Sequence, residues 1–162
     1  MRVFIGLGSN LADPAAQIEM AINALKSLPQ SIFIARSSLY SSPPMGPEDQ
    51  PDYINAVAEL DTALTAHDLL DQLQAIEQQQ GRLRQRHWGE RTLDLDLLLY
   101  GEQIFDDKHL QVPHPGIPLR SFVLYPLAEI APELIIPDMG DIEDLLRHCP
   151  RDGLHRIENS EL

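Results

Sequence analysis

The sequence is poor in cysteine, in long apolar runs and in positive charge, and each shortage excludes a class of protein. Its 162 residues contain one cysteine, Cys149, so neither an internal disulfide nor a cysteine-based zinc site can form. No apolar run approaches the roughly 20 residues of a membrane-spanning helix. The apolar start is interrupted at Gly8-Ser9-Asn10, too early for a secretory signal. We therefore expect a cytoplasmic protein with no membrane partner.

Positive charge is scarce but unevenly placed. Lysine and arginine number 12 against 25 aspartates and glutamates, which gives a net charge of −13. Binding to a nucleic acid needs basic residues that displace phosphate counterions, so we do not expect a nucleic-acid partner. Four of the arginines, Arg82, Arg84, Arg86 and Arg91, nevertheless fall close together. Such a cluster is either a site for an anion, whose geometry suits guanidinium groups, or a solvated basic loop.

The spacing of apolar residues predicts the order β-α-β-β-α-β. The expected strands cover residues 1–7, 31–39, 53–60 and 93–100, and the expected helices lie between Asp13 and Pro29 and between Thr65 and Gly81. This order is typical of the ferredoxin-like split βαβ arrangement, an α+β fold whose antiparallel sheet carries both main helices on one face. The other face would be left for loops and a ligand.

The remaining segments are expected to be short or irregular. Residues 40–52 contain four prolines and are expected to form a stiff exposed loop. Residues 81–92 are expected to be a polar loop, and residues 101–112 a small hairpin. Two short helices are expected at 119–131 and 141–149, as a C-terminal extension of one domain that spans residues 1–162. A fold of this class serves many functions, so it does not identify an activity.

The strongest chemical signal lies on the last main strand. If side chains alternate between the two faces, Leu93, Leu95 and Leu97 point into the core. Asp94 and Asp96 then share the opposite face, with their Cα atoms about 7 Å apart. Two oxygen ligands without a neighbouring histidine or cysteine suit Mg²⁺, which completes its shell with water and nucleotide phosphates. The alternative is an amphipathic strand with a solvated polar face.

The arginine cluster leads directly into this strand. Carboxylates for a metal and guanidinium groups for phosphate are the components of phosphoryl transfer. The sequence contains neither a P-loop motif nor the glycine-rich loop of protein kinases. A nucleotidyltransferase of the polymerase-β type also uses D-x-D on a strand, but its Gly-Ser helix start lies about ten residues upstream. Here Gly8-Ser9 is far from Asp94, which argues against that type.

Residues 88–96, Trp-Gly-Glu-Arg-Thr-Leu-Asp-Leu-Asp, closely resemble the signature of the 6-hydroxymethyl-7,8-dihydropterin pyrophosphokinases, a family of folate biosynthesis. The resemblance continues in order over most of the chain, at residues 4–11, 42–47, 50–56, 79–82, 112–115, 120–124 and 131–134. It implies transfer of the β,γ-diphosphate of ATP to the hydroxymethyl group of the dihydropterin, with release of AMP. The implied partners are these small molecules, and we expect a monomer.

The resemblance also implies roles for individual residues. The catalytic set would be Arg82, Arg91, Asp94 and Asp96, in which the two aspartates hold two Mg²⁺ ions for each ATP and the arginines contact the phosphates. The pterin-binding set would be Ser42, Pro43, Pro44, Met45, Tyr53, Asn55, Trp88 and Phe122. The ATP-binding set would be Gln74, Glu77, Arg82, Arg84, Trp88, Arg91, His114 and Arg120.

The implied roles agree with the chemistry of the side chains. Stacking against Tyr53 and Phe122 suits a flat heteroaromatic ring, and the amide of Asn55 offers a donor and an acceptor to its edge. Each residue also has a structural alternative. Tyr53 and Phe122 could be core aromatics, Asn55 could satisfy a loop backbone group, and His114 could be a turn residue. We interpret His67, His109, His148 and His155 as surface residues.

Two other functions remain open from the sequence. One is a non-catalytic ferredoxin-like sensor of a nucleotide or a pterin, which would not need the Asp94/Asp96 pair with the arginines. The other is a metal-dependent nucleotidyltransferase, which would release pyrophosphate instead of AMP.

Overall fold

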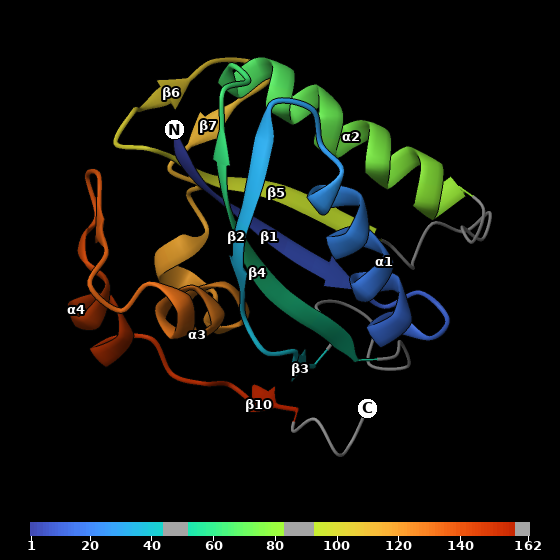
Figure 1. Cartoon of the computed structure of the whole chain (residues 1–162). Coiled ribbons are helices and arrows are strands. Elements are labelled where there is room, and N and C mark those ends of the chain that lie inside the picture. The colour runs from blue at the N-terminus through green and yellow to red at the C-terminus, as the bar shows by residue number, and fades with distance from the viewer. Residues whose placement is uncertain (44–51, 83–92, 158–162) are drawn as a thin grey trace.

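The computed structural model describes residues 1–43, 52–82 and 93–157, and the fold is an antiparallel sheet with helices packed against it (Figure 1). The main elements are β1 (Arg2–Ser9), α1 (Pro14–Lys26), β2 (Ser31–Arg36), β3 (Tyr40–Ser42), β4 (Tyr53–Thr62), α2 (Ala66–Arg82) and β5 (Leu93–Tyr100). They are followed by β6 (Phe105–Asp106), β7 (Gln111–Val112), a 3₁₀ turn (Ile117–Leu119), α3 (Ser121–Ile130), β8 (Ile135–Ile136), β9 (Gly140–Asp141), α4 (Ile142–Arg147) and β10 (His155–Arg156).

The main sheet has the strand order β10-β3-β4-β1-β5, and β2 pairs with β4 beside β3. All of these pairs are antiparallel. The α+β class is therefore confirmed, and the predicted order β-α-β-β-α-β holds apart from the additional short strand β3. In the described part of the chain β5 is an edge strand, so one side of its backbone faces a neighbour other than a strand.

Two hydrophobic cores lie on the two faces of the sheet. The first contains the apolar stripes of α1 and α2, including Ile22 and Leu73, and the alternating Leu93, Leu95 and Leu97 of β5. The second contains Leu124 and other residues of α3 and α4. Figure 1 shows α3 beside α4, away from α1 and α2. The expectation that the main helices share one face is confirmed, but α3 covers half of the face that was expected to be free.

An irregularity in β5 divides the second face into a covered half and an open half. The register between β1 and β5 shifts between Phe4 and Ile5, and both Leu98 and Leu99 then pack into the second core. A bulge of this kind changes the alternation of side chains along a strand. Leu98 and Leu99 thus belong to the covered half, and Asp94 and Asp96, which precede them on β5, line the open half of that face.

Some local expectations were wrong. Residues 40–42 form β3 and not a loop, because the prolines of this region begin only at Pro43. Asp13 precedes α1 with a left-handed backbone (φ 55°), and its side chain makes no capping hydrogen bond to the helix. Gly81 does not end α2, which continues to Arg82. Thr65 does cap α2, because its Oγ1 accepts from the backbone N–H of Asp68 at 3.1 Å.

Candidate functional site

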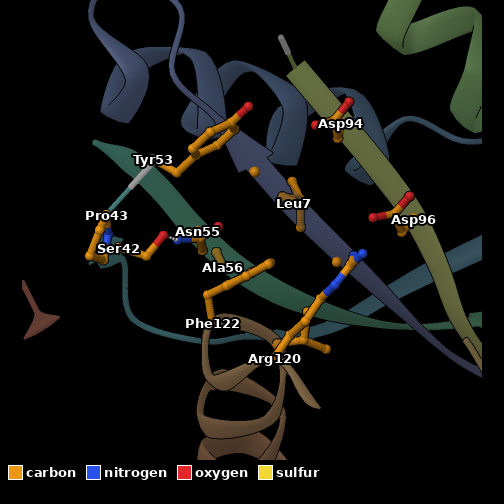
Figure 2. Close-up of a pocket in the computed structure, with 13 residues that line it drawn as sticks. Leu7, Ser42, Pro43, Tyr53, Asn55, Ala56, Asp94, Asp96, Arg120 and Phe122 are labelled. Carbon is orange, nitrogen blue, oxygen red and sulfur yellow. Dashed lines mark hydrogen bonds between the residues drawn. The ribbon is translucent and has the colours of Figure 1, made fainter. Parts of the chain in front are cut away.

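A cavity of about 140 Å³ opens on the uncovered half of the second face (Figure 2). Strands β4, β1 and β5 form its floor, and the start of α3 forms one side. Of the predicted pterin-binding residues, Ser42, Pro43, Tyr53, Asn55 and Phe122 line it. Of the other predicted residues, Asp94, Asp96 and Arg120 line it. The structure therefore brings residues from four separate segments of the chain to one site.

Two glycines of β1 leave the floor of this cavity bare. Gly8 pairs with Asn55 on one side and with Asp94 on the other, so these three residues lie in one line across the sheet. A Cβ atom on Gly8 would lie 3.2 Å from Asn55 Oδ1 and 3.9 Å from Tyr53 Cδ1. A side chain there would occupy the space above the strand. Glycine within a strand often marks the close approach of a ligand.

The amide of Asn55 is buried and already oriented. The residue is 3% exposed, and its Nδ2 donates to Ser42 Oγ at 2.8 Å. A longer contact of 3.4 Å joins Nδ2 to the backbone oxygen of Tyr40. The alternative expected Asn55 to satisfy a loop backbone group, but the backbone oxygen that it contacts belongs to strand β3, and its side chain also lines the cavity. The hydroxyl of Ser42 holds the amide in the orientation that a ligand would meet.

The two aromatic residues lie on different elements around the same cavity. Tyr53 begins β4 and Phe122 lies in the first turn of α3, and both are only half-buried. Figure 2 shows the two rings on different sides of the pocket, with Leu7 and Ala56 between them. Both rings line the cavity. Phe122 also packs against the second core, so it has part of the core role that we left open.

Asp96 lines a second opening as well. A groove of about 330 Å³ lies beyond the edge of β5, between Leu70 of α2 and the β6–β7 hairpin. His114 and Asp96 both line this groove, and Asp96 also lines the first cavity. The carboxylate of Asp96 is thus the point at which the two openings meet. An aromatic-lined cavity and a polar groove that share a carboxylate can hold two ligands with their reacting ends together.

Glu77 covers the free edge of β5. Its Oε2 accepts from the backbone N–H of Leu95 at 2.7 Å, so α2 supplies the partner that another strand would otherwise supply. Burial raises the pKa of Glu77 to about 7, the Leu95 hydrogen bond opposes the rise, and Asp94 and Asp96 add to it. Negative charge is therefore concentrated at this end of β5, and a bound cation would relieve it.

Replacement of Glu77 by glutamine is expected to remove a pH dependence of folding stability. In the wild type, folding favours the protonated form of Glu77 over the ionised carboxylate. The stability that this preference contributes is complete below about pH 4.5 and is lost as pH rises through about 7. Glutamine still accepts from Leu95. Urea unfolding without substrates or divalent cations should show Glu77→Gln gaining about 1 kcal/mol over wild type between pH 5 and pH 8, a value reduced for partial exposure. The exposed Glu102→Gln is the control, and an equal change in both variants would contradict the assignment.

His114 and Arg120 lie together beside Asp96. Burial lowers the pKa of His114. The negative charge of Asp96 opposes this decrease, and the positive charge of Arg120 lowers the pKa further. The Nδ1 of His114 accepts from the backbone N–H of Gly116 at 3.0 Å. His114 thus has the turn role that we left open and also lines the groove. Figure 2 shows the guanidinium of Arg120 directed toward the strand that carries Asp96.

Replacement of Gly116 by alanine is expected to displace Arg120 without unfolding the protein. Gly116 has φ −79°, which alanine adopts readily. The new Cβ would lie 2.9 Å from Arg120 Nε, so the flexible side chain must move. Steady-state kinetics should show about a tenfold loss in kcat/KM for ATP, and the unfolding temperature should not change. Arg120→Ala should give a similar loss, and the double variant no further loss. Additive losses would show that Gly116 does not act through Arg120.

Not every predicted residue can be placed in either opening. Gln74 is exposed on α2 and lines neither the cavity nor the groove, and Glu77 reaches the site only through the β5 edge. The predicted residues Pro44, Met45, Arg84, Trp88 and Arg91, and the side chain of Arg82, lie outside the part of the chain that the structure describes.

The sequence analysis missed two parts of the site. One is the glycine floor, for which Gly6-x-Gly8 inside an apolar strand is a usable signal. The other is the groove wall that the β6–β7 hairpin supplies through residues 107–111. No signal could have identified the wall, because it depends on how the hairpin folds back against β5 and α2.

The described residues were also searched for a metal site and a membrane segment. They contain no group of three or more histidine, cysteine, aspartate or glutamate side chains that could hold a metal ion. They also contain no helix long and apolar enough to cross a bilayer.

Taken together, the fold and the site suit a transferase that moves a phosphate-containing group onto a flat heteroaromatic substrate. Comparison with known proteins narrows this class. The family model described as 7,8-dihydro-6-hydroxymethylpterin-pyrophosphokinase matches residues 4–132. The chain therefore belongs to that family, as its motifs predicted.

Curated relatives agree along almost the whole chain. A protein of Pseudomonas aeruginosa named 2-amino-4-hydroxy-6-hydroxymethyldihydropteridine pyrophosphokinase is 53% identical over 156 residues, which are 96% of this chain and 96% of that protein. The protein of the same name from Haemophilus influenzae is 49% identical over 89% of this chain and 90% of its own. The predicted function, pyrophosphoryl transfer to 6-hydroxymethyl-7,8-dihydropterin in folate biosynthesis, is confirmed by this membership.

Solved structures support the fold. A crystal structure described as HPPK-DHPS in complex with substrates aligns with a TM-score of 0.73 at 12% identity, over 96% of this chain and 46% of that chain. A Plasmodium falciparum HPPK-DHPS triple mutant aligns with a TM-score of 0.71 at 13% identity, over 91% of this chain and 43% of that chain. The chain thus spans less than half the length of these two proteins, and the likeness concerns the fold alone.

Proposed function

We propose that the chain transfers the β,γ-diphosphate of ATP to the hydroxymethyl group of 6-hydroxymethyl-7,8-dihydropterin at the end of β5, as one domain that spans residues 1–162. The position of Asp96, which lines both the aromatic cavity and the polar groove, carries this assignment. The pterin occupies the cavity and ATP occupies the groove. The oxygen that attacks and the phosphorus that is attacked then meet beside one carboxylate.

The pterin ring lies over the bare backbone of Gly8. Its edge pairs with the amide of Asn55, which Ser42 keeps in place, and Tyr53 and Phe122 stack on its faces. Stacked aromatic pairs gain about 0.5–1.5 kcal/mol beyond burial. A heterocycle without a matching edge would leave the buried amide unpaired, so the pocket discriminates against it.

ATP lies in the groove with its phosphates directed toward Asp96. His114 and Arg120 face the phosphates, and Gln74 and Glu77 belong to the nucleotide side. The neutral form of His114, which its lowered pKa favours, presents a hydrogen-bonding ring without adding charge. Arg120, backed by the ring of Phe122 at 5.9 Å, supplies the positive charge.

Two Mg²⁺ ions would be held by Asp94 and Asp96. The donors fit this ion, because both are carboxylates on one face of a strand, and because their charge already raises the pKa of the neighbouring Glu77. Phosphate oxygens and water would complete the coordination. When bound, the ions would offset charge on the transferred group and on AMP.

The reaction is an in-line displacement. The hydroxymethyl oxygen forms a bond to the β-phosphorus, the bond from that phosphorus to the oxygen of the AMP phosphate breaks, and the hydroxyl proton passes to solvent. Positioning and charge supply most of the rate acceleration. Arg82 and Arg91 act as catalytic residues on the phosphates and Arg84 assists them. Pro44, Met45 and Trp88 complete the pterin side. We propose a monomeric, cytoplasmic enzyme.

The activity can be tested directly. The purified protein is incubated with ATP, MgCl₂ and 6-hydroxymethyl-7,8-dihydropterin, with and without EDTA, and nucleotides are separated by chromatography. The proposal expects AMP that depends on both the pterin and Mg²⁺. AMP that forms equally in EDTA would contradict the metal assignment, and release of pyrophosphate would indicate nucleotidyl transfer.

A further inference from the structure

The turn of the β6–β7 hairpin forms one wall of the groove. Residues 107–111 all line the opening, and Leu70 of α2 lines the opposite wall. The β6–β7 pair itself is only two residues long on each strand. So short a hairpin is marginal in stability unless other contacts support it. The width of the groove therefore depends on what holds this turn against α2.

One carboxylate organises the turn. Asp107 Oδ1 accepts from the backbone N–H groups of His109 at 2.8 Å and Leu110 at 2.9 Å. The backbone N–H of Asp107 donates to the oxygen of Leu110 at 3.0 Å, which closes the turn. The hydrogen bond from His109 and then the one from His67 lower the pKa of Asp107. Its carboxylate is therefore ionised and acts only as an acceptor at neutral pH.

The second oxygen of the same carboxylate is bound by α2. His67 Nε2 lies 2.9 Å from Asp107 Oδ2. The His67 ring also packs edge-on against Phe105, with ring centroids 5.8 Å apart and an interplanar angle of 85°. His67 precedes Leu70 by three residues, so the two share one face of the helix. Helix α2, which lines one side of the groove, is thus hydrogen-bonded through His67 to the turn that lines the other side.

We propose that His67 is a positioning residue for ATP, which fixes the hairpin turn against α2 through Asp107 and so sets the width of the groove. This inference rests on the proposed place of ATP in the groove. His67 is not assigned to the catalytic machinery, and about half of its side chain is exposed. An exposed pair of this kind adds little to global stability. Its effect should therefore appear in the affinity for ATP.

The first experiment measures steady-state kinetics of His67→Ala, His67→Gln and the control His148→Ala, which removes an exposed histidine of the C-terminal region. His67→Ala is expected to raise KM for ATP about fivefold, with kcat and KM for the pterin within twofold of wild type. The amide of His67→Gln can still donate to Asp107, so this variant should recover part of the loss. An unchanged KM for ATP in His67→Ala, or an equal loss in all parameters, would overturn the proposal.

A double-mutant cycle separates the proposed contact from a general effect of each substitution. Asp107→Asn keeps an oxygen for the turn but loses an acceptor for His67. It is expected to raise KM for ATP as His67→Ala does, and the double variant should show no further rise. Independent, multiplying effects would contradict a shared contact.

The place of ATP is tested separately by hydrogen exchange of the wild-type chain with a non-hydrolysable ATP analogue. Protection of residues 107–111 on binding would support the placement, and its absence would refute both the placement and the inference. Protection in wild type together with an unchanged KM for ATP in His67→Ala would leave the placement intact and overturn only the role of His67.

Discussion

Replacement of Asp96 by asparagine is expected to lower kcat by about a thousandfold or more, while the affinity for the pterin changes only a few-fold. Asparagine keeps the size of the side chain but loses the charge that would hold Mg²⁺. Because Asp96 lines both the cavity and the groove, the substitution removes the charge between the two proposed substrate sites. Loss of a group that acts only on the transition state lowers kcat more than binding.

The measurement is the rate of AMP release at saturating substrates, with pterin binding followed by calorimetry. Asp71→Asn, an exposed aspartate of α2 that lines neither opening, is the matched control and should retain full activity. A kcat within tenfold of wild type in Asp96→Asn would remove this carboxylate from the reaction centre.

Replacement of Asn55 by alanine is expected to weaken pterin binding by about ten- to a hundredfold, which corresponds to about 1.4–2.8 kcal/mol. Asn55 is 3% exposed and lines the cavity from β4, so the ligand loses a buried hydrogen-bonding partner that water cannot replace. Binding of an ATP analogue should not change, because the groove does not contain Asn55.

Ser42→Ala is the control for this substitution. It removes the hydroxyl that accepts from Asn55 Nδ2 at 2.8 Å but keeps the amide, so the loss in pterin affinity should be smaller. Calorimetric titration with the pterin gives both values, and circular dichroism confirms that the variants are folded. An Asn55→Ala variant with wild-type pterin affinity would show that the pterin does not bind at Asn55.

The sheet and its main helices were predictable because their apolar periodicities are strong. The alternation of Leu93, Leu95 and Leu97 correctly placed Asp94 and Asp96 on one face, opposite α1 and α2. The short strand at residues 40–42 was missed, because the prolines that follow it made the whole segment resemble a loop. Three residues carry too little periodicity to reveal a strand.

The arrangement around the site was only partly predictable. Pairing between strands far apart in the sequence places Asn55, Gly8 and Asp94 in one line, and no local pattern encodes that register. The shift of register beside Leu98, which belongs to the covered half of the face, is equally invisible in the sequence, because Leu97–Leu99 reads as a uniform apolar run. The resemblance to the family supplied Asn55 and Asp94 as site residues but not Gly8, and the strand register explains why the three residues lie together.

The contact between α2 and the β6–β7 hairpin is likewise a property of the tertiary structure. His67 lies on the surface, as expected, yet its contact with Asp107 joins residues 40 positions apart in the sequence. Only the folded hairpin shows that this surface histidine contacts a residue that lines the groove.

The central claim is that a diphosphate moves from ATP to the pterin in one step, and isotope labelling of the ATP phosphates tests it most directly. Separate reactions use ATP labelled with ³²P at the α, β or γ position, together with 6-hydroxymethyl-7,8-dihydropterin and Mg²⁺. Transfer of a diphosphate in one step predicts that both the β and the γ label appear on the pterin, while the α label stays with AMP. Appearance of the γ label alone, or of the α label on the pterin, would contradict the account.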